Sequence, residues 1–348
     1  MRYFSQNSSW ATVTLLLYRG FARISLSKEA QFCSKSGRLC IMKYDYDLIV
    51  LGGGSAGLSL ASVAARLGVK VALIDKGSLG GDCLHYGCVP SKTLIHSAKV
   101  AHMAKTGGRY GVHASDVHIN FEEVMQRIRS VITTIQHHVD NADRFRGLGC
   151  DVWTEKTGTF EDAYTIQLHS ERGSKLASIT GKKIAICTGT RPRFLALSGL
   201  DTVGFITNEE LFSITAQPKR LIIIGSGPIG CEMAQAMQRL GTQVILLNRS
   251  DHIMGVEDED VQQFMQQVFE GEGIEMHLGI DMQEARLDGT DKVITFQKDG
   301  VTSAVRADEI LVAVGRTSNA DLLHCENAGV ILDQRGYVQT NTKLQTTQ

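Results

Sequence analysis

The feature that most constrains the fold of this chain is a glycine-rich turn placed between an apolar run and a helix-compatible segment. The run Asp47–Leu51 leads directly into Gly-Gly-Gly-Ser-Ala-Gly, and Leu58–Leu67 follows. In a strand–turn–helix unit, Gly52 permits the tight turn, Gly54 lets the backbone approach a pyrophosphate, and Gly57 allows close helix–strand packing. The free N–H groups and the dipole at the helix N-terminus favour an anion. The pattern predicts a dinucleotide-binding βαβ unit.

An acidic residue stands where such a unit needs one. The next predicted strand, Val69–Ile74, ends in Asp75, eighteen residues after the last glycine of the turn. A carboxylate at this strand end can accept a hydrogen bond from a ribose hydroxyl. Asp75 is therefore expected to bind the adenosine ribose of the nucleotide.

The same order of elements occurs a second time. Arg220–Ile224 leads into Gly-Ser-Gly-Pro-Ile-Gly, followed by the helix-compatible Cys231–Leu240 and the strand Val244–Leu247. In the position of the acid stands Asn248, with Arg249 next to it. An arginine without the carboxylate suits a 2′-phosphate, so this copy favours NADP(H) over NAD(H); a solvated arginine at a strand end is the alternative. The glycines of this turn are Gly225, Gly227 and Gly230.

Short strands are predicted between the two turns. Lys183–Cys187 is expected to be a parallel strand that ends at the small residues Thr188 and Gly189, and Glu309–Val314 is a comparable strand that ends at Gly315. A small antiparallel insertion is predicted before the first of these. Its strands are Asp151–Lys156, Thr159–Asp162, Tyr164–His169 and Leu176–Thr180.

These elements predict an α/β fold with two Rossmann-like dinucleotide-binding domains, each with a small antiparallel insertion. Residues 45–200 are expected to form the first domain, residues 201–312 the second, and residues 313–348 a return to the first. The length of 348 residues fits about two domains at roughly 150 residues each.

Composition excludes several classes of protein. With 36 basic and 37 acidic side chains the net charge is -1, which gives no support to nucleic-acid binding or to a polybasic membrane contact. Eight cysteines are too sparse for a disulfide-stapled secreted domain, so a reduced compartment is expected. The sequence lacks an apolar run of the roughly 18 to 20 residues that a membrane span needs.

Residues 1–44 differ from the rest of the chain. They are rich in Ser, Arg and Lys and contain a single acid, Glu29. Such a leader resembles a mitochondrial transit peptide, which would place the protein in the mitochondrial matrix. The favoured interpretation is that Met42 is the real start, because it runs straight into the first strand; the protein is then cytoplasmic.

Two cysteines lie in a glycine-rich loop after the first predicted unit. Cys83 and Cys88 are five residues apart, in a stretch that also contains Gly80, Gly81 and Gly87. Five residues of regular helix rise about 7.5 Å, more than the roughly 6.8 Å that separates the Cα atoms of a disulfide. If the two cysteines are bonded, the segment must bend, and the glycines permit this.

A helix is predicted to begin at about Cys88, because Pro90 stands just before Ser91–Met103. A cysteine at a helix N-terminus has its thiolate stabilised, as a redox-active thiol requires. Zinc has little support, because only His85 accompanies Cys83 and Cys88 locally, so no metal site is expected. A structural disulfide is disfavoured in a reduced compartment, and two buried free thiols are the ordinary alternative. Redox activity is favoured.

These motifs together resemble the pyridine nucleotide-disulfide oxidoreductases, a family that includes dihydrolipoyl dehydrogenase, mercuric reductase and glutathione reductase. The resemblance covers residues 45–348. It includes both glycine turns, the loop Gly-Cys-Val-Pro-Ser-Lys, the pair Thr188-Gly189 and the stretch Val-Gly-Arg that ends at Arg316. Lys92 directly after Ser91 is closer to the lipoamide and mercuric branches, whereas Arg249 departs from the lipoamide enzymes, which usually carry Glu at the position of Asn248. The substrate therefore stays open among lipoamide, mercuric ion and glutathione-like disulfides. The loop differs from the commoner family residues at Asp82, His85 and Tyr86.

The resemblance implies an electron relay from NAD(P)H at the second glycine turn to FAD at the first, and then to a Cys83–Cys88 disulfide. Cys88 would face the flavin and form a thiolate–flavin adduct, and Cys83 would be the outer thiol that attacks the substrate disulfide. Lys92 and Glu232 match positions that approach the flavin and the nicotinamide; a solvated lysine and a helix-dipole acid are the alternatives. The other cofactor-binding candidates are Thr188, Gly189, Asn248, Arg249 and Gly315.

Relatives continue beyond residue 348 with a Gly-Asp turn that binds the flavin and a dimerisation domain that supplies an acid–base histidine. Neither follows Gly336–Gln348 here, so a C-terminally truncated chain that dimerises and turns over poorly is expected, whereas the full-length form is expected to be a homodimer. Two other functions stay open: a flavin-dependent NAD(P)H oxidase or transhydrogenase, and a non-catalytic FAD- or NAD(P)-binding fragment.

Overall fold

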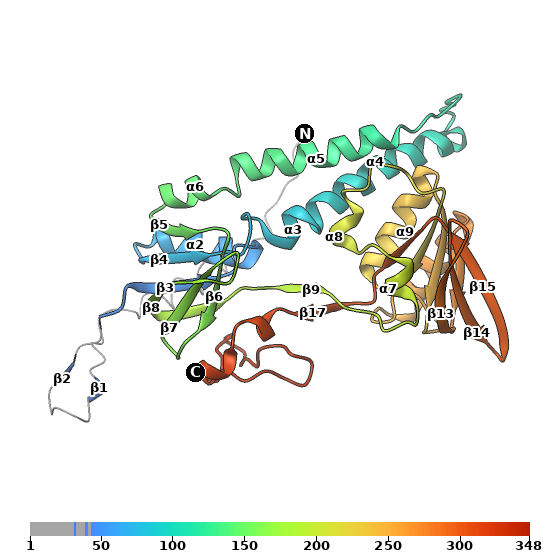
Figure 1. The fold of residues 1–348 in the computed structure, drawn as a ribbon. Helices are drawn as coiled ribbons and strands as arrows, with labels where there is room; N and C mark the ends of the chain where they lie inside the picture. Colours follow the sequence, from blue (N-terminus) through green and yellow to red (C-terminus); the bar gives the residue numbers. More distant parts are fainter. Residues whose placement is uncertain (1–30, 33–38, 41–42) are drawn as a thin grey trace. The chain divides into compact units, whose positions relative to one another are not determined.

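The computed structural model describes residues 31–32, 39–40 and 43–348, and its contacts divide the chain into two units, Met1–Asp45 and Tyr46–Gln348. In the first unit the described residues form an antiparallel pair, β1 (Gln31–Phe32) with β2 (Leu39–Cys40). The two interpretations of residues 1–44, a transit peptide or a later start, concern residues that lie mostly outside the described part of the chain. All further elements belong to the second unit (Figure 1).

A six-stranded mixed sheet comes first in this unit, with the strand order β5-β4-β3-β8-β7-β6. β3 pairs in parallel with β4 and β8, and β4 pairs in parallel with β5. The residues of β3 and β4 are almost all buried, because α2 covers one face of this sheet and apolar residues of β6 and β7 cover the other. The bounds are β3 (Tyr46–Leu51), α2 (Ser55–Arg66), β4 (Val71–Ile74) and β5 (Cys150–Trp153).

Two details of the predicted antiparallel insertion are wrong. The segment Asp151–Lys156 is predicted to belong to it, but β5 extends the parallel sheet beside β4. Leu176–Thr180 and Lys183–Cys187 are predicted as separate strands, but they form one strand, β8, which pairs with β7 and then with β3. A β-carbon at Gly181 would lie 2.8 Å from the side chain of Ile49, so this glycine permits close approach instead of a turn. The bounds are β6 (Lys156–Phe160), β7 (Thr165–Ser170) and β8 (Lys175–Ile186).

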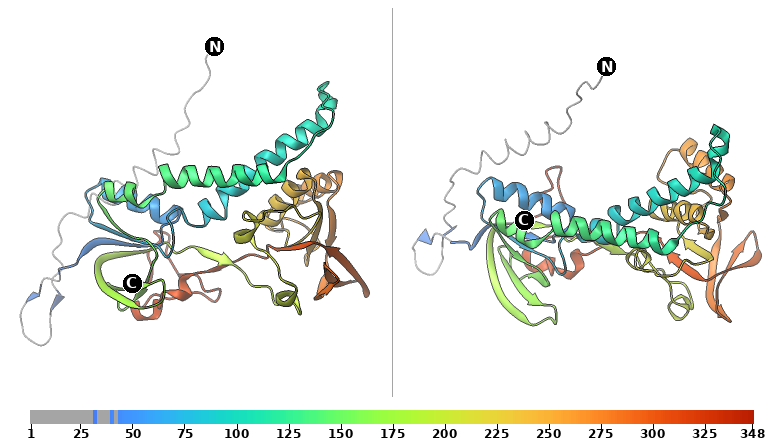
Figure 2. Two further views of the ribbon diagram at one scale, coloured as in Figure 1. Left: turned by 45° about the horizontal axis from the view of Figure 1, so that its top comes forward. Right: turned by 90° about the horizontal axis from the view of Figure 1, so that it is seen from above.

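A helical segment connects β4 to β5. Its two longest helices, α4 and α5, lie side by side (Figure 2). α4 also packs against α9 (Pro228–Leu240), a helix that connects two strands of the second sheet. Leu94 of α4, Met125 of α5 and Met233 of α9 share one buried apolar cluster, which fixes α4 between the two sheets. The bounds are α3 (Gly81–His85), α4 (Cys88–Thr106), η1 (Gly107–Tyr110), α5 (Phe121–His138) and α6 (Ala142–Gly147).

The second sheet repeats the plan of the first. Its order is β12-β11-β10-β16 with all pairs parallel, and a separate antiparallel sheet, β13-β14-β15, follows β12 in the chain. The repeated strand–turn–helix–strand order of the sequence therefore corresponds to a repeated parallel sheet. The bounds are β10 (Arg220–Ile224), α9 (Pro228–Leu240), β11 (Gln243–Asn248), α10 (Glu259–Gly271), β12 (Glu275–Leu278), β13 (Asp281–Asp288), β14 (Asp291–Lys298), β15 (Val301–Ala307) and β16 (Glu309–Val312).

Two short strands, β9 (Thr190–Pro192) and β17 (Arg316–Ser318), pair antiparallel where the chain passes between the two sheets in each direction. The predicted α/β class with two Rossmann-like units is confirmed. Among the described residues, none of the helices combines the length and apolar character of a membrane span. The remaining elements are α7 (Leu200–Val203), α8 (Asn208–Leu211), η2 (Ala320–Leu322) and η3 (Cys325–Ala328).

Candidate active site

The first glycine turn lies at the carboxyl end of β3 and is packed without spare room. Gly52 has φ +105°, and a β-carbon there would lie 2.3 Å from the carbonyl oxygen of Cys187, directly after the neighbouring strand β8. A β-carbon at Gly57 would lie 1.8 Å from the carbonyl oxygen of Gly52. Only glycine fits at these two positions, which brings the first turn of α2 down onto the strand end. At Gly54 a β-carbon would meet only the Cα of Gly81, at 3.7 Å.

The second glycine turn has the same geometry. Gly225 has φ +104°, and a β-carbon there would lie 2.5 Å from the carbonyl oxygen of Ala313. A β-carbon at Gly230 would lie 1.9 Å from the carbonyl oxygen of Gly225, whereas at Gly227 it would meet no described atom within 4 Å. The middle glycine of the second turn thus leaves its backbone open to an approaching group, whereas Gly54 of the first turn lies against Gly81.

The N-termini of α2 and α9 are both available to an anion. Gly54 and Gly227 are their N-caps, and among the described residues no side chain caps either helix and no acid stands in either first turn. The first N–H groups of a helix need acceptors, and the helix dipole favours a negative one. The residues present therefore fit a dinucleotide at each turn.

Asp75 lies at the end of β4 beside the first turn. Its carboxylate accepts hydrogen bonds from the backbone N–H of Gly53 at 2.6 Å and of Gly77 at 2.8 Å. A carboxylate offers about four acceptor positions, so two remain for a ribose hydroxyl. Asp75 therefore supports the turn itself, a role that the sequence pattern does not show.

Asn248 and Arg249 lie at the matching end of β11 but point to different partners. The Asn248 amide donates to the carbonyl oxygens of Ser250 at 3.0 Å and His252 at 3.1 Å, so it holds its own loop. Arg249 is exposed and lines a hollow of about 440 Å³ together with Lys298. The two cations could contact a phosphate, but two carboxylates, Asp281 and Asp299, also line the hollow and balance their charge. The remaining lining residues are Gly279, Ile280, Gln297 and Gly300.

The cysteine loop is attached directly to the first glycine turn. The backbone N–H of Gly80 donates to the carbonyl oxygen of Gly53 at 2.8 Å. A β-carbon at Gly81 would lie only 2.6 Å from the Cα of Gly54. The short helix α3 starts at this contact, the chain bends at Gly87, and α4 begins at Cys88 as predicted. The bend that a Cys83–Cys88 bond requires is therefore present.

The two cysteines are thiols in this structure, with Cys83 half-buried and Cys88 exposed. Burial first, then a hydrogen bond with Cys88 and the negative charges of Cys88 and Asp82, together raise the pKa of the Cys83 thiol to about 11. Cys83 is thus held as a neutral thiol in the dithiol state. Attack as a thiolate, the role that the family resemblance implies, needs a base that removes this proton.

Lys92 and Glu232 contact each other although they lie on two different helices, α4 and α9. Lys92 Nζ contacts the two carboxylate oxygens of Glu232 at 2.7 and 2.8 Å. Both side chains are partly exposed, at 60% and 36%. The pair links the helix that begins at Cys88 to the helix of the second glycine turn, so the structure brings these two predicted site residues together.

The small-residue turn after β8 is fastened to the end of β17. The amide of Asn319 donates to the carbonyl oxygen of Thr188 at 2.9 Å, and its backbone N–H donates to that of Gly189 at 3.1 Å. The carbonyl oxygen of Gly315 accepts from the backbone N–H of Arg193 at 2.9 Å. Thr188 and Gly189 therefore lie beside the first glycine turn, whereas Gly315 follows Ala313 and Val314, which lie against Gly225 of the second turn.

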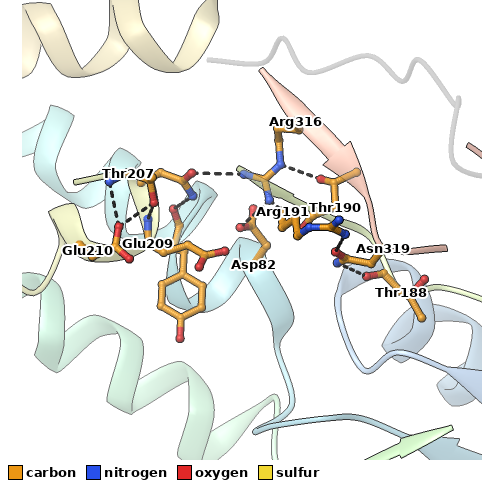
Figure 3. Close-up of polar contacts among 11 residues, drawn as sticks. Asp82, Thr188, Thr190, Arg191, Thr207, Glu209, Glu210, Arg316 and Asn319 are labelled. Carbon is orange, nitrogen blue, oxygen red and sulfur yellow. Dashed lines mark hydrogen bonds and ion pairs between the residues drawn. The ribbon is translucent and has the colours of Figure 1, made fainter. Parts of the chain in front are cut away.

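Sequence reasoning missed two residues next to the cysteine loop. Arg316 on β17 forms an ion pair with Asp82 at 2.9 Å, and Asn208 at the start of α8 donates to the carbonyl oxygen of Tyr86 at 3.0 Å (Figure 3). The sequence signals were the place of Arg316 in the family-like stretch Val-Gly-Arg and the departure of Asp82 from the family pattern. Neither shows the two contacts, because both join residues more than 120 positions apart. Among the described residues, no group of three or more His, Cys, Asp or Glu side chains is arranged to hold a metal ion.

Curated relatives and solved structures resemble this chain over most of its length. Dihydrolipoyl dehydrogenase of Bacillus subtilis is 32% identical over 88% of this chain and 65% of its own length. Mercuric reductase of Staphylococcus aureus is 30% identical over 87% of this chain and 54% of its own length. The chain therefore spans less than two thirds of these relatives.

A solved structure, the Cu(II) complex of the HOCl-induced flavoprotein disulfide reductase RclA from Escherichia coli, superposes with a TM-score of 0.73 at 25% identity. The similarity covers 88% of this chain and 64% of that one. The family model for pyridine nucleotide-disulphide oxidoreductases matches residues 46–348. The chain therefore belongs to the pyridine nucleotide-disulphide oxidoreductase family.

Proposed function

We propose that this protein passes electrons from NAD(P)H through FAD to a disulfide formed by Cys83 and Cys88, and from there to a small disulfide or metal–thiol substrate. The observation that carries the proposal is the contact between the cysteine loop and the first glycine turn. Gly80 bonds to Gly53, and Gly81 packs against Gly54, so the loop starts on the backbone that would bind the flavin dinucleotide.

Each part of the chain has a task in this relay. The N-termini of α2 and α9 bind the two pyrophosphates, and Asp75 binds the ribose of FAD. When bound, FAD accepts an electron pair from the nicotinamide and transfers it to a disulfide. Lys92, four residues beyond Cys88, and its partner Glu232 carry opposite charges between the two nucleotide sites and orient the reacting rings.

The cysteines complete the reaction. Reduction of the Cys83–Cys88 disulfide by two electrons and two protons yields two thiols. The Cys83 sulfur, once deprotonated, attacks one sulfur of the substrate disulfide and releases the other as a thiol. Cys88 then attacks the mixed disulfide, which restores the Cys83–Cys88 bond and releases the second thiol. The sum is NAD(P)H, a proton and a disulfide converted to NAD(P)⁺ and a dithiol.

The substrate class follows the relatives. Their names specify dihydrolipoyl, mercuric and disulfide substrates. The chain's own residues add a preference for NADPH, through Arg249 and Lys298. A homodimer of the full-length form, which would supply the base for Cys83, and a location in the cytoplasm complete the proposal.

The test is the visible spectrum of the purified chain before and after one equivalent of NADPH or NADH. A yellow protein that forms a long-wavelength band on reduction supports the proposal, because a thiolate next to oxidised flavin produces that band. Bleaching without the band indicates a simple flavin reductase or oxidase, and a colourless protein that binds no added FAD contradicts the proposal. Parallel assays with dihydrolipoamide, Hg(II) and glutathione disulfide then identify the substrate.

A further inference from the structure

Arg316 is the centre of a polar cluster that reaches the cysteine loop from the crossing strands (Figure 3). Its Nη2 donates to the Asp82 carboxylate at 2.9 Å and to the carbonyl oxygen of Thr190 at 3.0 Å. Its Nε donates to the Thr190 hydroxyl at 2.6 Å, and its Nη1 donates to Asn208 Oδ1 at 3.3 Å. The guanidinium therefore binds three elements at once through its planar set of donors.

Asn208 extends this cluster to the other side of the loop. Its side chain lies almost wholly in the interior, at 7% exposure, and its Nδ2 donates to the carbonyl oxygen of Tyr86 while Oδ1 accepts from Arg316. The position of Asn208 is fixed because a capping box of Thr207 and Glu210 starts α8 at this residue. A buried amide whose two ends are both bonded is costly to move.

The two contacts hold the loop on both flanks of the first cysteine. Asp82 directly precedes Cys83, and Tyr86 is two residues before Cys88. Arg316 itself lies on β17, which pairs antiparallel with β9. The side chain of Asn319, directly after β17, donates to the carbonyl oxygen of Thr188 and so strengthens this pairing. The loop is thus attached at Gly80 to the glycine turn, at Asp82 to Arg316 of β17, and at Tyr86 to Asn208 of α8.

We propose that Arg316 is a positioning residue: by holding Asp82 directly, and Tyr86 through Asn208, it keeps the Cys83 and Cys88 sulfurs within bonding reach. This inference rests on the proposed function, because it concerns the same two cysteines. Arg316 takes no part in the chemistry itself. Its effect is to raise the effective concentration of one thiol at the other, which favours the closed disulfide over the open dithiol.

The stability of the closed disulfide is measured by the redox equilibrium between the Cys83–Cys88 pair and glutathione. Oxidation of the protein dithiol by glutathione disulfide gives the Cys83–Cys88 bond and two molecules of reduced glutathione. Arg316→Met releases Asp82 and removes the Arg316–Asn208 hydrogen bond that supports the contact with Tyr86. The equilibrium constant for closing the bond should therefore fall about tenfold, which is a rise of about 30 mV in the midpoint potential.

Arg191→Met is the matched control. Arg191 lies on the same pair of strands, and its described hydrogen bonds go to Ser318, Asn319 and Asp321 instead of the loop. Removal of this arginine breaks a comparable ion pair, with Asp321, on the same pair of strands. If Arg316 had a merely structural role, the equilibrium constant for closing the disulfide would change equally in both variants. A positioning role predicts the tenfold fall for Arg316→Met and less than about a twofold change for Arg191→Met.

Loss of Arg316 also leaves the Asp82 charge unpaired, so a third variant separates charge from position. In Asp82→Asn with Arg316→Met no unpaired charge remains, yet the loop is still free; its equilibrium constant should stay low. A return to the wild-type value would overturn the inference, since the effect would then come from the carboxylate. Arg316→Lys serves if Arg316→Met fails to fold: lysine can pair with Asp82 but cannot reach Thr190 and Asn208 together, so about a threefold fall is expected.

The measurement is made on the full chain in glutathione buffers of graded ratio, followed by alkylation and mass analysis of the peptide that contains both cysteines. Wild-type values in Arg316→Met and in Arg316→Lys overturn the inference. A wild-type chain that never forms the Cys83–Cys88 bond, but gives only mixed disulfides with glutathione, overturns the proposed function instead. The two failures are therefore distinguishable.

Discussion

Lys92 on α4 and Glu232 on α9 form an ion pair with two contacts, at 2.7 and 2.8 Å, although they are 140 residues apart in the sequence. Each lies four residues beyond the first residue of its helix, and those helices begin at Cys88 and at the second glycine turn. The pair therefore joins the two cofactor regions one helical turn behind their N-termini.

Loss of either member of this pair should affect electron transfer more than stability. Both side chains are partly exposed, so Lys92→Met and Glu232→Gln should each change the free energy of unfolding by less than about 1 kcal/mol. The rate of flavin reduction by NADPH should fall by at least about tenfold, since one oriented charge is lost beside the reacting groups. Urea unfolding and stopped-flow absorbance measure the two quantities. Lys182→Met, which removes another exposed ion pair, with Asp47, is the control and should leave the rate unchanged.

Replacement by alanine should have different effects on stability and on NADPH binding at the second and third glycines of the second glycine turn, Gly227 and Gly230. Gly230→Ala places a β-carbon 1.9 Å from the carbonyl oxygen of Gly225, so it should cost about 1 to 3 kcal/mol of stability through overpacking. Gly227→Ala meets no described atom within 4 Å and should leave stability nearly unchanged, but its methyl group occupies the surface that a pyrophosphate approaches. NADPH binding by Gly227→Ala, measured by fluorescence, should weaken about tenfold or more. Tight binding in a stable Gly227→Ala would contradict the assignment of this turn.

The local parts of the fold could be predicted because they depend on local sequence. The glycine turns require glycine for steric reasons that hold wherever strand, turn and helix follow one another, and α4 begins at Cys88 as the proline after it indicates. The predicted strand Arg220–Ile224 is confirmed residue for residue as β10. Burial on both faces of the sheet makes such runs continuously apolar, which a sequence shows directly.

The wrong or missing parts depend on contacts between distant residues. Gly181 looks like a strand break in the sequence. Glycine is needed there because a β-carbon would clash with the side chain of Ile49, which lies on β3 more than 130 positions earlier. The contacts of Arg316 with Asp82 and of Asn208 with Tyr86 likewise join separate elements. Neither a period nor a motif shows such pairs, so the support around the cysteine loop could be identified only in three dimensions.

Arg249 should determine the preference between the two nicotinamide nucleotides. It lines the hollow at the end of β11 with Lys298, where the first glycine unit instead has Asp75. Arg249→Gln should weaken NADPH binding about tenfold and leave NADH binding almost unchanged, because only the 2′-phosphate loses a charged partner. Isothermal titration with both nucleotides measures this. Arg306→Gln, an exposed arginine paired with Asp288, is the control; equal losses for both nucleotides in Arg249→Gln would refute the assignment.

Cys88→Ser should separate flavin binding from communication with the flavin. Cys88 is exposed at the first position of α4, and a serine there keeps the size and the helix start. The variant should bind flavin with an unchanged yellow spectrum but lose the long-wavelength band on reduction, since that band needs a thiolate beside the ring. Absorbance between the flavin peak and the near infrared decides it. A band that survives in Cys88→Ser and disappears in Cys83→Ser would reverse the assigned roles of the two cysteines.

The pH dependence of alkylation at Cys83 should show its raised pKa. A thiol reacts with iodoacetamide as thiolate, so its rate follows the ionised fraction. With the pKa near 11 instead of 9.0, the Cys83 rate in the reduced chain should reach half its maximum near pH 11, and at pH 7 the thiolate fraction should be only about 10⁻⁴. In Cys88→Ser the charge of Cys88 is lost, while burial and a hydroxyl that can bond to Cys83 remain, so the midpoint should move only part of the way back toward 9. Peptide mapping after timed alkylation gives the profile, and a midpoint below pH 9 in the wild type would show that Cys83 ionises without an external base.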